Sequence, residues 1–209
     1  MIFERGQRIV FIGDSITEAG RCVPDSPFGT GYMNLVRSFV TARYPELGLE
    51  WENRGVGGDT SRDMAARWER DAIDLRPDWL SIKIGINDVG RKYRGRPHDA
   101  VPIDEYEATL RTLAQRAVEV TGCRLIIAEP YVIEADLSEP RHAETRTFAA
   151  VARKVASDLG AISIHTQEAI DRALQSMPGE SWSHDRIHPN LPGHAVIALE
   201  YLRAIGFDL

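Results

Sequence analysis

The chain has 209 residues, 43% of them apolar, which is enough to bury one substantial core, so we expect a single domain spanning residues 1–209. Its 25 basic and 31 acidic residues give a formal charge of -6, a balance that disfavours nucleic acid and anionic membranes as partners. The first residues hold only a short apolar run bracketed by charge, which is too short for a signal peptide or a membrane span. We therefore expect a cytoplasmic protein. In that compartment Cys22 and Cys123 are expected to be free thiols.

Strand-like and helix-like segments alternate along the sequence. Short apolar runs rich in branched residues predict five strands, at residues 8–12, 49–52, 79–84, 124–128 and 161–164. Apolar residues recur at helical spacing over residues 32–43, 61–75, 104–120, 144–159, 167–176 and 192–205. This alternation predicts an α/β fold in which helices cover both faces of a five-stranded parallel sheet. Ligands of such sheets bind beyond the carboxyl ends of the strands, so we expect chemistry directly after them.

The first predicted strand is followed by Gly13, Asp14 and Ser15, at the start of a short helical turn. Ser15 has two interpretations. Its hydroxyl can act as a nucleophile at the sheet edge, where a helix N-terminus favours developing negative charge. Alternatively, Ser15 and Glu18 have the S-x-x-E spacing of a capping box, in which the hydroxyl accepts a backbone N–H. By itself, this motif favours the cap.

Turns suited to binding an oxyanion follow the second and third predicted strands. In GVGGD, residues 55–59, the N–H of Gly58 can approach a substrate closely, and in GIND, residues 85–88, the carboxamide of Asn87 can donate from the side chain. Each turn is also explained by ordinary strand-to-helix geometry. The glycine spacing lacks the third glycine of GxGxxG, and no phosphate-binding GxxxxGK[ST] motif occurs, so a nucleotide cofactor is not indicated.

A carboxylate and an imidazole that could activate a serine lie near the C-terminus. Asp185 precedes His188 by three residues, close enough on a turn to accept one ring proton and leave the other ring nitrogen free to take a proton from Ser15. His184 and His194 lie nearby, which leaves a metal site as a weaker alternative because no HExxH or CxxC spacing is present.

Several further residues are candidates for contacts with substrate. The segment of residues 90–98 carries four cationic side chains around Tyr93 and is either a lid or subunit contact over the site or a solvated surface loop. Tyr131 and Trp182 can stack on a sugar ring, although large aromatic residues more often pack. Asp14 is also a candidate contact, and we expect it and Asp88 to fix their loops through backbone hydrogen bonds.

Together, these motifs resemble those of the SGNH hydrolases, also called GDSL esterases, which are named after a Ser, Gly, Asn and His that Ser15, Gly58, Asn87 and His188 match. The resemblance spans residues 8–194. Stretches such as NRGVGGDTSRDMAARWE, KIGINDVGRKY and DRIHPNLPGHAVIA are similar to bacterial intracellular acetylxylan esterases of this family. Those esterases are expected to carry a tryptophan immediately before the catalytic acid, where this chain has His184.

The resemblance implies a flavodoxin-like three-layer α/β/α fold and the removal of acetyl groups from xylo-oligosaccharides or related acetylated sugars. It also implies a homo-oligomer that needs no metal or other cofactor. In the expected mechanism Ser15 attacks an acetyl carbonyl, His188 is the general base, Asp185 stabilises the imidazolium, and Ser15, Gly58 and Asn87 hold the oxyanion. The alternatives are a lysophospholipase or thioesterase that uses the same triad, and a non-catalytic flavodoxin-like module that binds phosphate.

Overall fold

Five parallel strands form the centre of the computed structural model, which describes residues 1–208. They are β1 (Arg8–Gly13), β2 (Glu50–Gly55), β3 (Trp79–Lys83), β4 (Arg124–Ala128) and β5 (Ile162–Ile164). Their order is β2-β1-β3-β4-β5, and every neighbouring pair is parallel. This is a flavodoxin-like order that reverses beside β1 and β3, so a ligand is expected at the carboxyl ends of these two strands.

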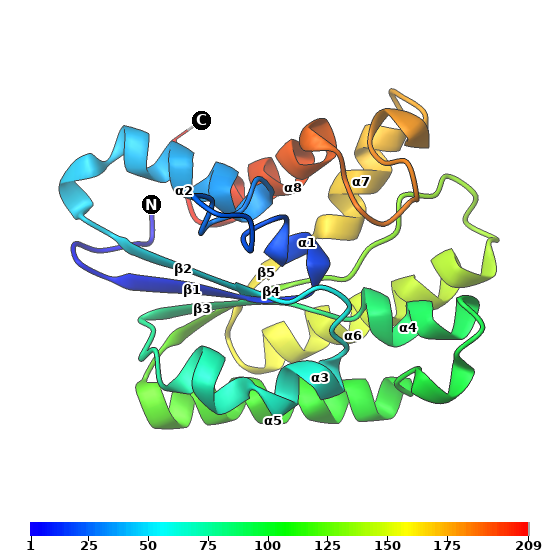
Figure 1. The fold of residues 1–209 in the computed structure, drawn as a ribbon, viewed down its shortest axis with the longest axis horizontal. Helices are drawn as coiled ribbons and strands as arrows, with labels where there is room; N and C mark the ends of the chain where they lie inside the picture. Colours follow the sequence, from blue (N-terminus) through cyan, green and yellow to red (C-terminus); the bar gives the residue numbers. More distant parts are fainter. Residues whose placement is uncertain (209) are drawn as a thin grey trace.

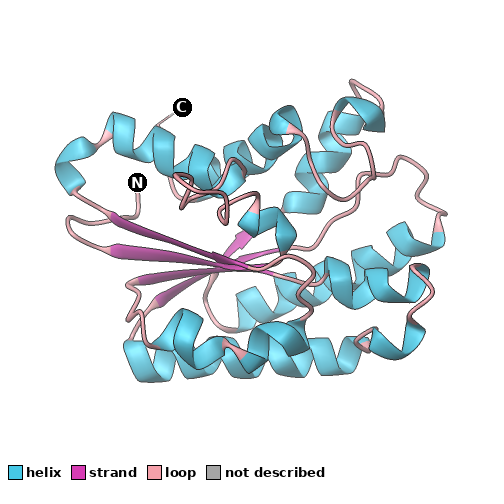
Figure 2. Ribbon diagram, in the orientation of Figure 1, coloured by secondary structure: helices cyan, strands magenta, loops and turns pink. Residues whose placement is uncertain are grey.

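Helices cover both faces of this sheet, which confirms the predicted three-layer α/β/α fold (Figure 1). One face carries α2 (Tyr32–Arg43), α7 (Thr166–Leu174) and α8 (Leu191–Ala204), and the other carries α3 (Ser61–Ala66), α5 (Ile103–Thr121) and α6 (Pro140–Asp158). Two more helices, α1 (Ser15–Glu18) and α4 (Ile86–Tyr93), begin within three residues of the ends of β1 and β3. Figure 2 shows the loops that leave the carboxyl ends of the strands gathered on one side of the sheet, between these helices.

The inner strands β1, β3 and β4 are buried on both faces, so their alternate side chains enter two separate apolar cores. Ile9 and Phe11 of β1 pack with α2 and α8, whereas Val10 and Ile12 pack with α3, α5 and α6. All four side chains are at most 1% exposed, and each fully buried side chain of this kind contributes about 1.5–3 kcal/mol. This two-sided burial explains why β1 reads as a continuous apolar run rather than an alternating one.

The predicted segments differ from the observed ones mainly at helix boundaries. The helix predicted over residues 61–75 is interrupted, because α3 ends at Ala66 and a π-helical turn covers Glu69–Ile73. The helix predicted over residues 144–159 begins at Pro140, since the Glu139 carboxylate caps it by accepting the N–H of His142. The helix α4 was not predicted. Single 3₁₀ turns lie at Pro45–Leu47, Pro97–Asp99 and Gly179–Ser181.

Within residues 1–208, no helix has both the length and the apolar character needed to cross a membrane. Cys22 is exposed and Cys123 is buried, and both are free thiols.

Candidate active site

Ser15, His188 and Asp185 form a continuous hydrogen-bonded chain beside β1. Ser15 Oγ lies 2.9 Å from His188 Nε2, and His188 Nδ1 lies 2.6 Å from Asp185 Oδ2. Because a carboxylate can only accept, Nδ1 carries the ring proton and Nε2 is free to accept the proton of the serine hydroxyl. The structure thus brings together three residues that the sequence separates by up to 173 positions.

The loop that carries Asp185 and His188 is held by the aspartate itself. Asp185 Oδ1 accepts the backbone N–H groups of Ile187 at 2.9 Å and His188 at 2.8 Å, which requires a tight turn. Arg186, within this turn, has a φ of 67°, in the left-handed region that a side chain rarely adopts. Burial opposes ionisation of Asp185, but the hydrogen bonds from His188 and Ile187 outweigh it and hold the pKa of this carboxyl well below its usual range. Asp185 is therefore anionic under the conditions in which His188 would act.

The segment of residues 131–133 also holds this loop in place. The Tyr131 hydroxyl donates to the carbonyl of Ile187 at 3.3 Å, and the N–H of Ile133 donates to the carbonyl of Arg186 at 2.8 Å. The Tyr131 ring is completely buried, so the expectation that it stacks on a sugar is wrong. Its structural role is to position the histidine loop.

Asp14, rather than Ser15, caps the helix α1. The Asp14 carboxylate accepts the N–H of Ile16 at 2.9 Å, and Ser15 is the first residue of the helix. The capping-box interpretation of Ser15 and Glu18 is therefore wrong, and the Ser15 hydroxyl remains available to His188. Asp14 is completely buried, so the expectation that it contacts substrate is also wrong, while its expected role in fixing the loop is confirmed. Asp88 acts in the same way by accepting the N–H of Ser61 at 3.0 Å.

Three hydrogen-bond donors from three different turns lie at this edge of the sheet. Within residues 1–208, the N–H groups of Ser15 and Gly58 donate to no other backbone group. Asn87 is buried and uses one of its two amide protons to bind the carbonyl of Asp59 at 3.0 Å, which fixes the carboxamide and leaves the other proton free. Gly58 has a φ of 84°, a conformation that favours glycine. Such an arrangement of donors is suited to stabilising a tetrahedral oxyanion.

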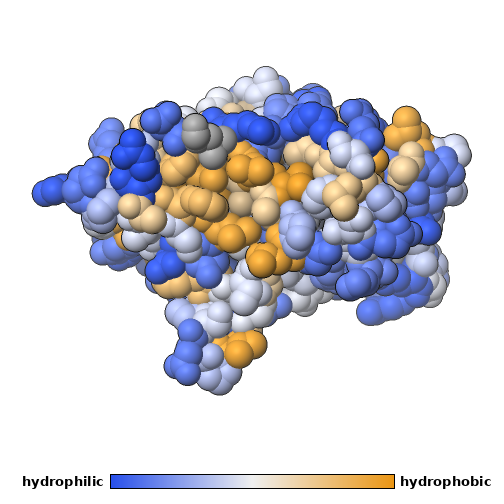
Figure 3. Space-filling view, turned by 90° about the horizontal axis from the view of Figure 1, so that it is seen from above, coloured by the Kyte–Doolittle hydropathy of each residue, from blue (hydrophilic) through white to orange (hydrophobic). Residues whose placement is uncertain are grey.

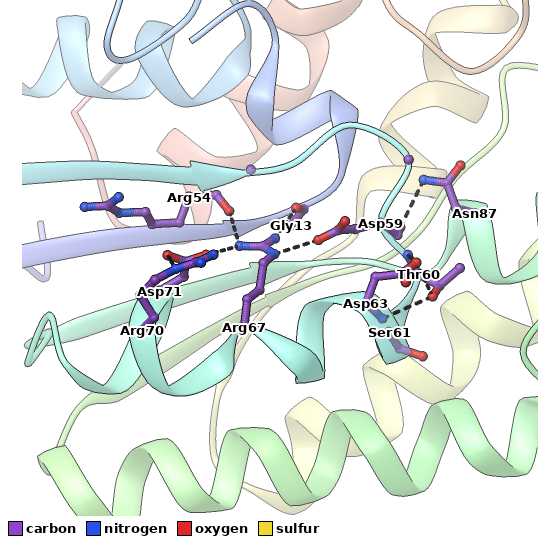
Figure 4. Close-up of polar contacts among 12 residues, drawn as sticks. Gly13, Arg54, Asp59, Thr60, Ser61, Asp63, Arg67, Arg70, Asp71 and Asn87 are labelled. Atoms are coloured by element: carbon purple, nitrogen blue, oxygen red, sulfur yellow. Dashed lines mark hydrogen bonds and ion pairs between the residues drawn. The ribbon is translucent and has the colours of Figure 1, made fainter. Parts of the chain in front are cut away.

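Arg67, which sequence reasoning missed, binds Asp59 in the turn that follows β2 (Figure 4). The guanidinium binds Asp59 at 2.7 Å and Asp71 at 3.0 Å, and it donates to the carbonyls of Gly13 and Arg54. Only 9% of this side chain is exposed. Arg67 therefore links the ends of β1 and β2 to the turn that contains Gly58 and Asp59.

Arg91 holds the same turn from the side of α4. Its guanidinium donates to the carbonyl of Gly58 at 3.0 Å and to Asp63 at 2.9 Å. Arg91 belongs to the basic segment of residues 90–98, whose first four residues lie in α4 and not in a surface loop. In the same helix turn, Lys92 and the Tyr93 hydroxyl both bind Glu144 of α6.

One cavity, of about 350 Å³, contains the serine and the histidine. It is also lined by Ile16, Ala19, Thr30, Pro189, Leu191 and His194. A second cavity, of about 370 Å³, lies between the loop at Glu134–Leu137 and α7 and includes none of the triad residues. Because Ser15 is the expected nucleophile, the cavity that contains Ser15 and His188 is the candidate substrate site.

The histidines near the C-terminus are not gathered as metal ligands. His194 is 8% exposed, and its Nδ1 accepts the N–H of Tyr32 at 3.2 Å, while His184 is exposed. Among residues 1–208, no three His, Cys, Asp or Glu side chains are grouped so that they could hold a metal ion. Trp182 is partly buried, and its Nε1 donates to the carbonyl of Met177. Its expected contact with substrate, like that of Tyr93, stays a prediction.

A buried lysine also lies beneath the site. Lys83, the last residue of β3, is completely buried, and its Nζ lies 4.7 Å from the centre of the Tyr131 ring. Burial lowers the pKa of this ammonium, and the carboxylate of Asp14 acts in the opposite direction. In the sequence Lys83 is one charge within an apolar run, which gave no sign that its ammonium lies over the Tyr131 ring.

Known proteins are similar to this chain in sequence and in fold. The model of the GDSL-like Lipase/Acylhydrolase family matches residues 11–196. An acetylxylan esterase of Geobacillus stearothermophilus is 38% identical over 210 residues, which cover 97% of this chain and 95% of that protein.

Solved structures are also similar to this chain. The crystal structure of Axe2, an acetylxylan esterase from Geobacillus stearothermophilus, matches with a TM-score of 0.95 and 38% identity, covering 100% of this chain and 98% of that chain. An alpha/beta hydrolase enzyme from the metagenome of Lake Arreo, Spain, matches with a TM-score of 0.94 and 38% identity, covering 99% of this chain and 98% of that chain. Three further matches are catalytic mutants of Axe2 in which a serine, an aspartate or a histidine is replaced by alanine.

Proposed function

Because the chain belongs to the GDSL-like lipase/acylhydrolase family, we propose that it is a serine esterase that removes acetyl groups from acetylated xylo-oligosaccharides or related sugars. The observation that carries this proposal is the hydrogen-bonded chain from Ser15 through His188 to Asp185, with unused backbone donors beside the serine. Further support comes from Axe2, whose catalytic mutants replace a serine, an aspartate and a histidine.

The reaction proceeds in two steps. Ser15 Oγ attacks the acetyl carbonyl while His188 Nε2 takes the hydroxyl proton, and Asp185 stabilises the imidazolium that forms. The oxyanion of the tetrahedral intermediate receives hydrogen bonds from the N–H groups of Ser15 and Gly58 and from the Asn87 carboxamide. His188 returns the proton to the departing sugar hydroxyl. A water molecule, deprotonated by His188, then attacks the acetyl carbonyl, and His188 gives this proton to Ser15 Oγ as acetate leaves.

The decisive variant is Ser15→Ala, assayed with p-nitrophenyl acetate and with acetylated xylo-oligosaccharides. We expect kcat to fall by several orders of magnitude, on the order of 10⁴ or more, with the fold intact. Hydrolysis at the wild-type rate would rule out the proposal. Chain-length preference is measured separately, by comparing p-nitrophenyl esters from acetate to decanoate. A preference for the long esters would instead support the lysophospholipase or thioesterase alternative.

We also propose that the enzyme assembles into a homo-oligomer and acts on its saccharide in the cytoplasm. The proposed assembly is supported by an apolar surface over α2 and α8, shown in Figure 3. Its exposed members include Phe39, which is 52% exposed, and Leu199, which is 40% exposed. Soluble monomers rarely expose large contiguous apolar patches. Sedimentation of the wild type and of Phe39→Asp measures the assembly, and a monomeric wild type contradicts it.

A further inference from the structure

Arg141 is a half-buried cation, and part of its guanidinium has no hydrogen-bond partner among residues 1–208. It is the second residue of α6, and its Nε and one terminal nitrogen are buried and bind no hydrogen-bond acceptor within residues 1–208. Leaving guanidinium protons unpaired away from water is unfavourable. The N-terminus of a helix is also the end at which a positive charge is least favourable. Arg141 therefore lies where it lowers the stability of the isolated chain, which is typical of a group with a ligand to bind.

The guanidinium lies against α4, beside a glycine that leaves room for it. A Cβ added to Gly90 would lie 3.0 Å from a terminal nitrogen of Arg141 and 3.8 Å from its Cζ. Glycine in a helix interior is less favourable than alanine, and Gly90 does not need a left-handed backbone. The glycine is thus explained by the space it gives to Arg141. Gly90 is three residues beyond Asn87, so this guanidinium lies about one helical turn from the oxyanion residue.

Charged groups of both signs act on the Arg141 guanidinium. Burial and then the charge of Arg94 lower the pKa of Arg141, and Arg186 acts in the same direction, while Glu139 and Asp185 oppose them. The two acidic members of the loop region are already engaged, since Asp185 binds His188 and Glu134 binds Arg186. Arg94, at the C-terminal cap of α4, is exposed. Arg141 thus packs against α4 at Gly90, and Arg94 directly follows the last residue of that helix.

We propose that Arg141, assisted by Arg94, is a subsite for a carboxylate carried by the substrate, such as a uronic acid substituent on an acetylated xylo-oligosaccharide. This inference rests on the proposed function, because it names a feature of the substrate of that site. A planar guanidinium binds a carboxylate through two parallel hydrogen bonds, and it stays protonated at every working pH. The chain as a whole has a charge of -6, so an anionic substrate needs a local cationic contact to bind here. Arg141 does not line the cavity at Ser15, which leaves that cavity to the uncharged part of the substrate.

The first experiment compares acetate release from two acetylated xylo-oligosaccharides that differ only in one glucuronic acid substituent. For Arg141→Met, we expect the KM of the acidic substrate to rise about tenfold with kcat nearly unchanged. The reason is that the lost charge-assisted hydrogen bonds would hold the substrate equally well in the ground state and in the transition state. The KM of the neutral substrate should change little. The matched control is Arg146→Met, which removes the same charge from the same helix, where Arg146 binds Asp171 of α7. This control should leave both KM values unchanged.

Two further variants test geometry rather than charge. Gly90→Ala keeps both arginines but displaces the guanidinium of Arg141, so it should also raise the KM of the acidic substrate. Arg141→Lys keeps the charge but loses the two-pronged geometry, and it should give an intermediate KM. If Arg141→Met does not fold, as judged by circular dichroism, these two variants carry the comparison.

A separate inhibition experiment does not depend on the saccharide substrate. Glucuronate should inhibit the hydrolysis of p-nitrophenyl acetate by the wild type competitively, and this inhibition should weaken in Arg141→Met and at high salt. If the wild type hydrolyses p-nitrophenyl acetate but neither saccharide, the proposed substrate is contradicted. In that case, inhibition by glucuronate still tests whether the arginines bind a carboxylate.

Three results would overturn the carboxylate subsite. The first is equal KM values for the acidic and neutral saccharides in the wild type, together with no inhibition by glucuronate. The second is an Arg141→Met variant that loses both saccharide activities equally, which would indicate a structural role. The third is a change in oligomeric state on sedimentation with an unchanged KM ratio, which would show that Arg141 pairs with a carboxylate of a second copy.

Discussion

Arg67 and Asp59 form a nearly buried ion pair, with Arg67 Nε 2.7 Å from Asp59 Oδ2, and Asp59 directly follows Gly58 in the chain. The same aspartate accepts the Asn87 carboxamide at its backbone carbonyl. One residue therefore connects the buried guanidinium to two of the three proposed oxyanion donors. The position of these donors depends on Arg67 although that side chain never reaches the substrate.

Replacing Arg67 with methionine should destabilise the protein by about 3 kcal/mol, because the carboxylate of Asp59 is left buried without its partner and Asp71 keeps only Arg70. The midpoint of urea unfolding measures this loss. Arg70 is the matched control, since it also binds Asp71 but is 74% exposed. Arg70→Met should leave the midpoint nearly unchanged. Equal midpoints for the two variants would contradict the role assigned to Arg67.

Arg91→Met should lower kcat for p-nitrophenyl acetate about tenfold with little effect on KM. The reason is that Arg91 holds the carbonyl of Gly58, whose N–H is needed chiefly in the transition state, where one donor contributes about 10² to 10³ in rate. The neighbouring Lys92 binds Glu144 instead, so Lys92→Met serves as the control and should keep the wild-type kcat. The idea fails if Arg91→Met changes KM alone.

Asp14 and Ser15 should separate stability from activity. Asp14→Ala removes the helix cap and should cost at least about 1 kcal/mol of folding free energy. Ser15→Ala removes no cap and should leave the melting temperature close to that of the wild type while abolishing hydrolysis. A thermal unfolding series of the two variants checks this difference. A melting temperature as low for Ser15→Ala as for Asp14→Ala would restore the capping-box interpretation.

His194 should make the folded state sensitive to mild acid. Burial, followed by the charges of Lys83 and His188, lowers the pKa of this imidazole to about 4. The unfolded chain takes up this proton near pH 6.5, so stability is full above that pH and falls as the pH drops toward 4, by up to about 3 kcal/mol. Burial raises the pKa of Asp88 to about 6, which acts in the opposite direction over the same range.

The variant His194→Asn isolates this contribution, because its carbonyl oxygen can still accept the N–H of Tyr32 but cannot take up a proton. Urea unfolding at pH 4.5 and pH 7 should show a smaller loss of stability for the variant than for the wild type. Asp88 is present in both proteins and cancels in that difference. An identical loss in the two proteins would mean that His194 is not held neutral by the fold.

The sequence predicted best those features that depend on residues close together in the chain. The apolar strands, the glycine turns and the three-residue spacing of Asp185 and His188 are short-range features, so they predicted both the sheet and the residues that meet at its edge. The pairing of Ser15 with His188 is long-range, and it was predicted only because a nucleophilic serine requires a base. The structure does bring these two side chains together.

What the sequence did not reveal depends on contacts between distant elements. Arg67 binds groups from β1, β2 and two turns, and no local pattern links it to them. Tyr131 has the composition of a stacking residue, and only the packed loop around it shows that it is buried. The helix α4 was hidden because its charged half resembles a solvated loop, and the partners of that half, Gly58 and Glu144, lie on other elements.

The separation of 173 positions between Ser15 and His188 makes activity a measure of complete folding. The serine follows the first strand, whereas the histidine precedes the last helix, so a partly folded chain with a native-like sheet but an undocked α8 has no base beside its nucleophile. Recovery of hydrolysis after dilution from denaturant would therefore report the slowest docking step of the chain. Far-ultraviolet circular dichroism would report helix and strand formation earlier, and the delay between the two signals would time the closure of the fold.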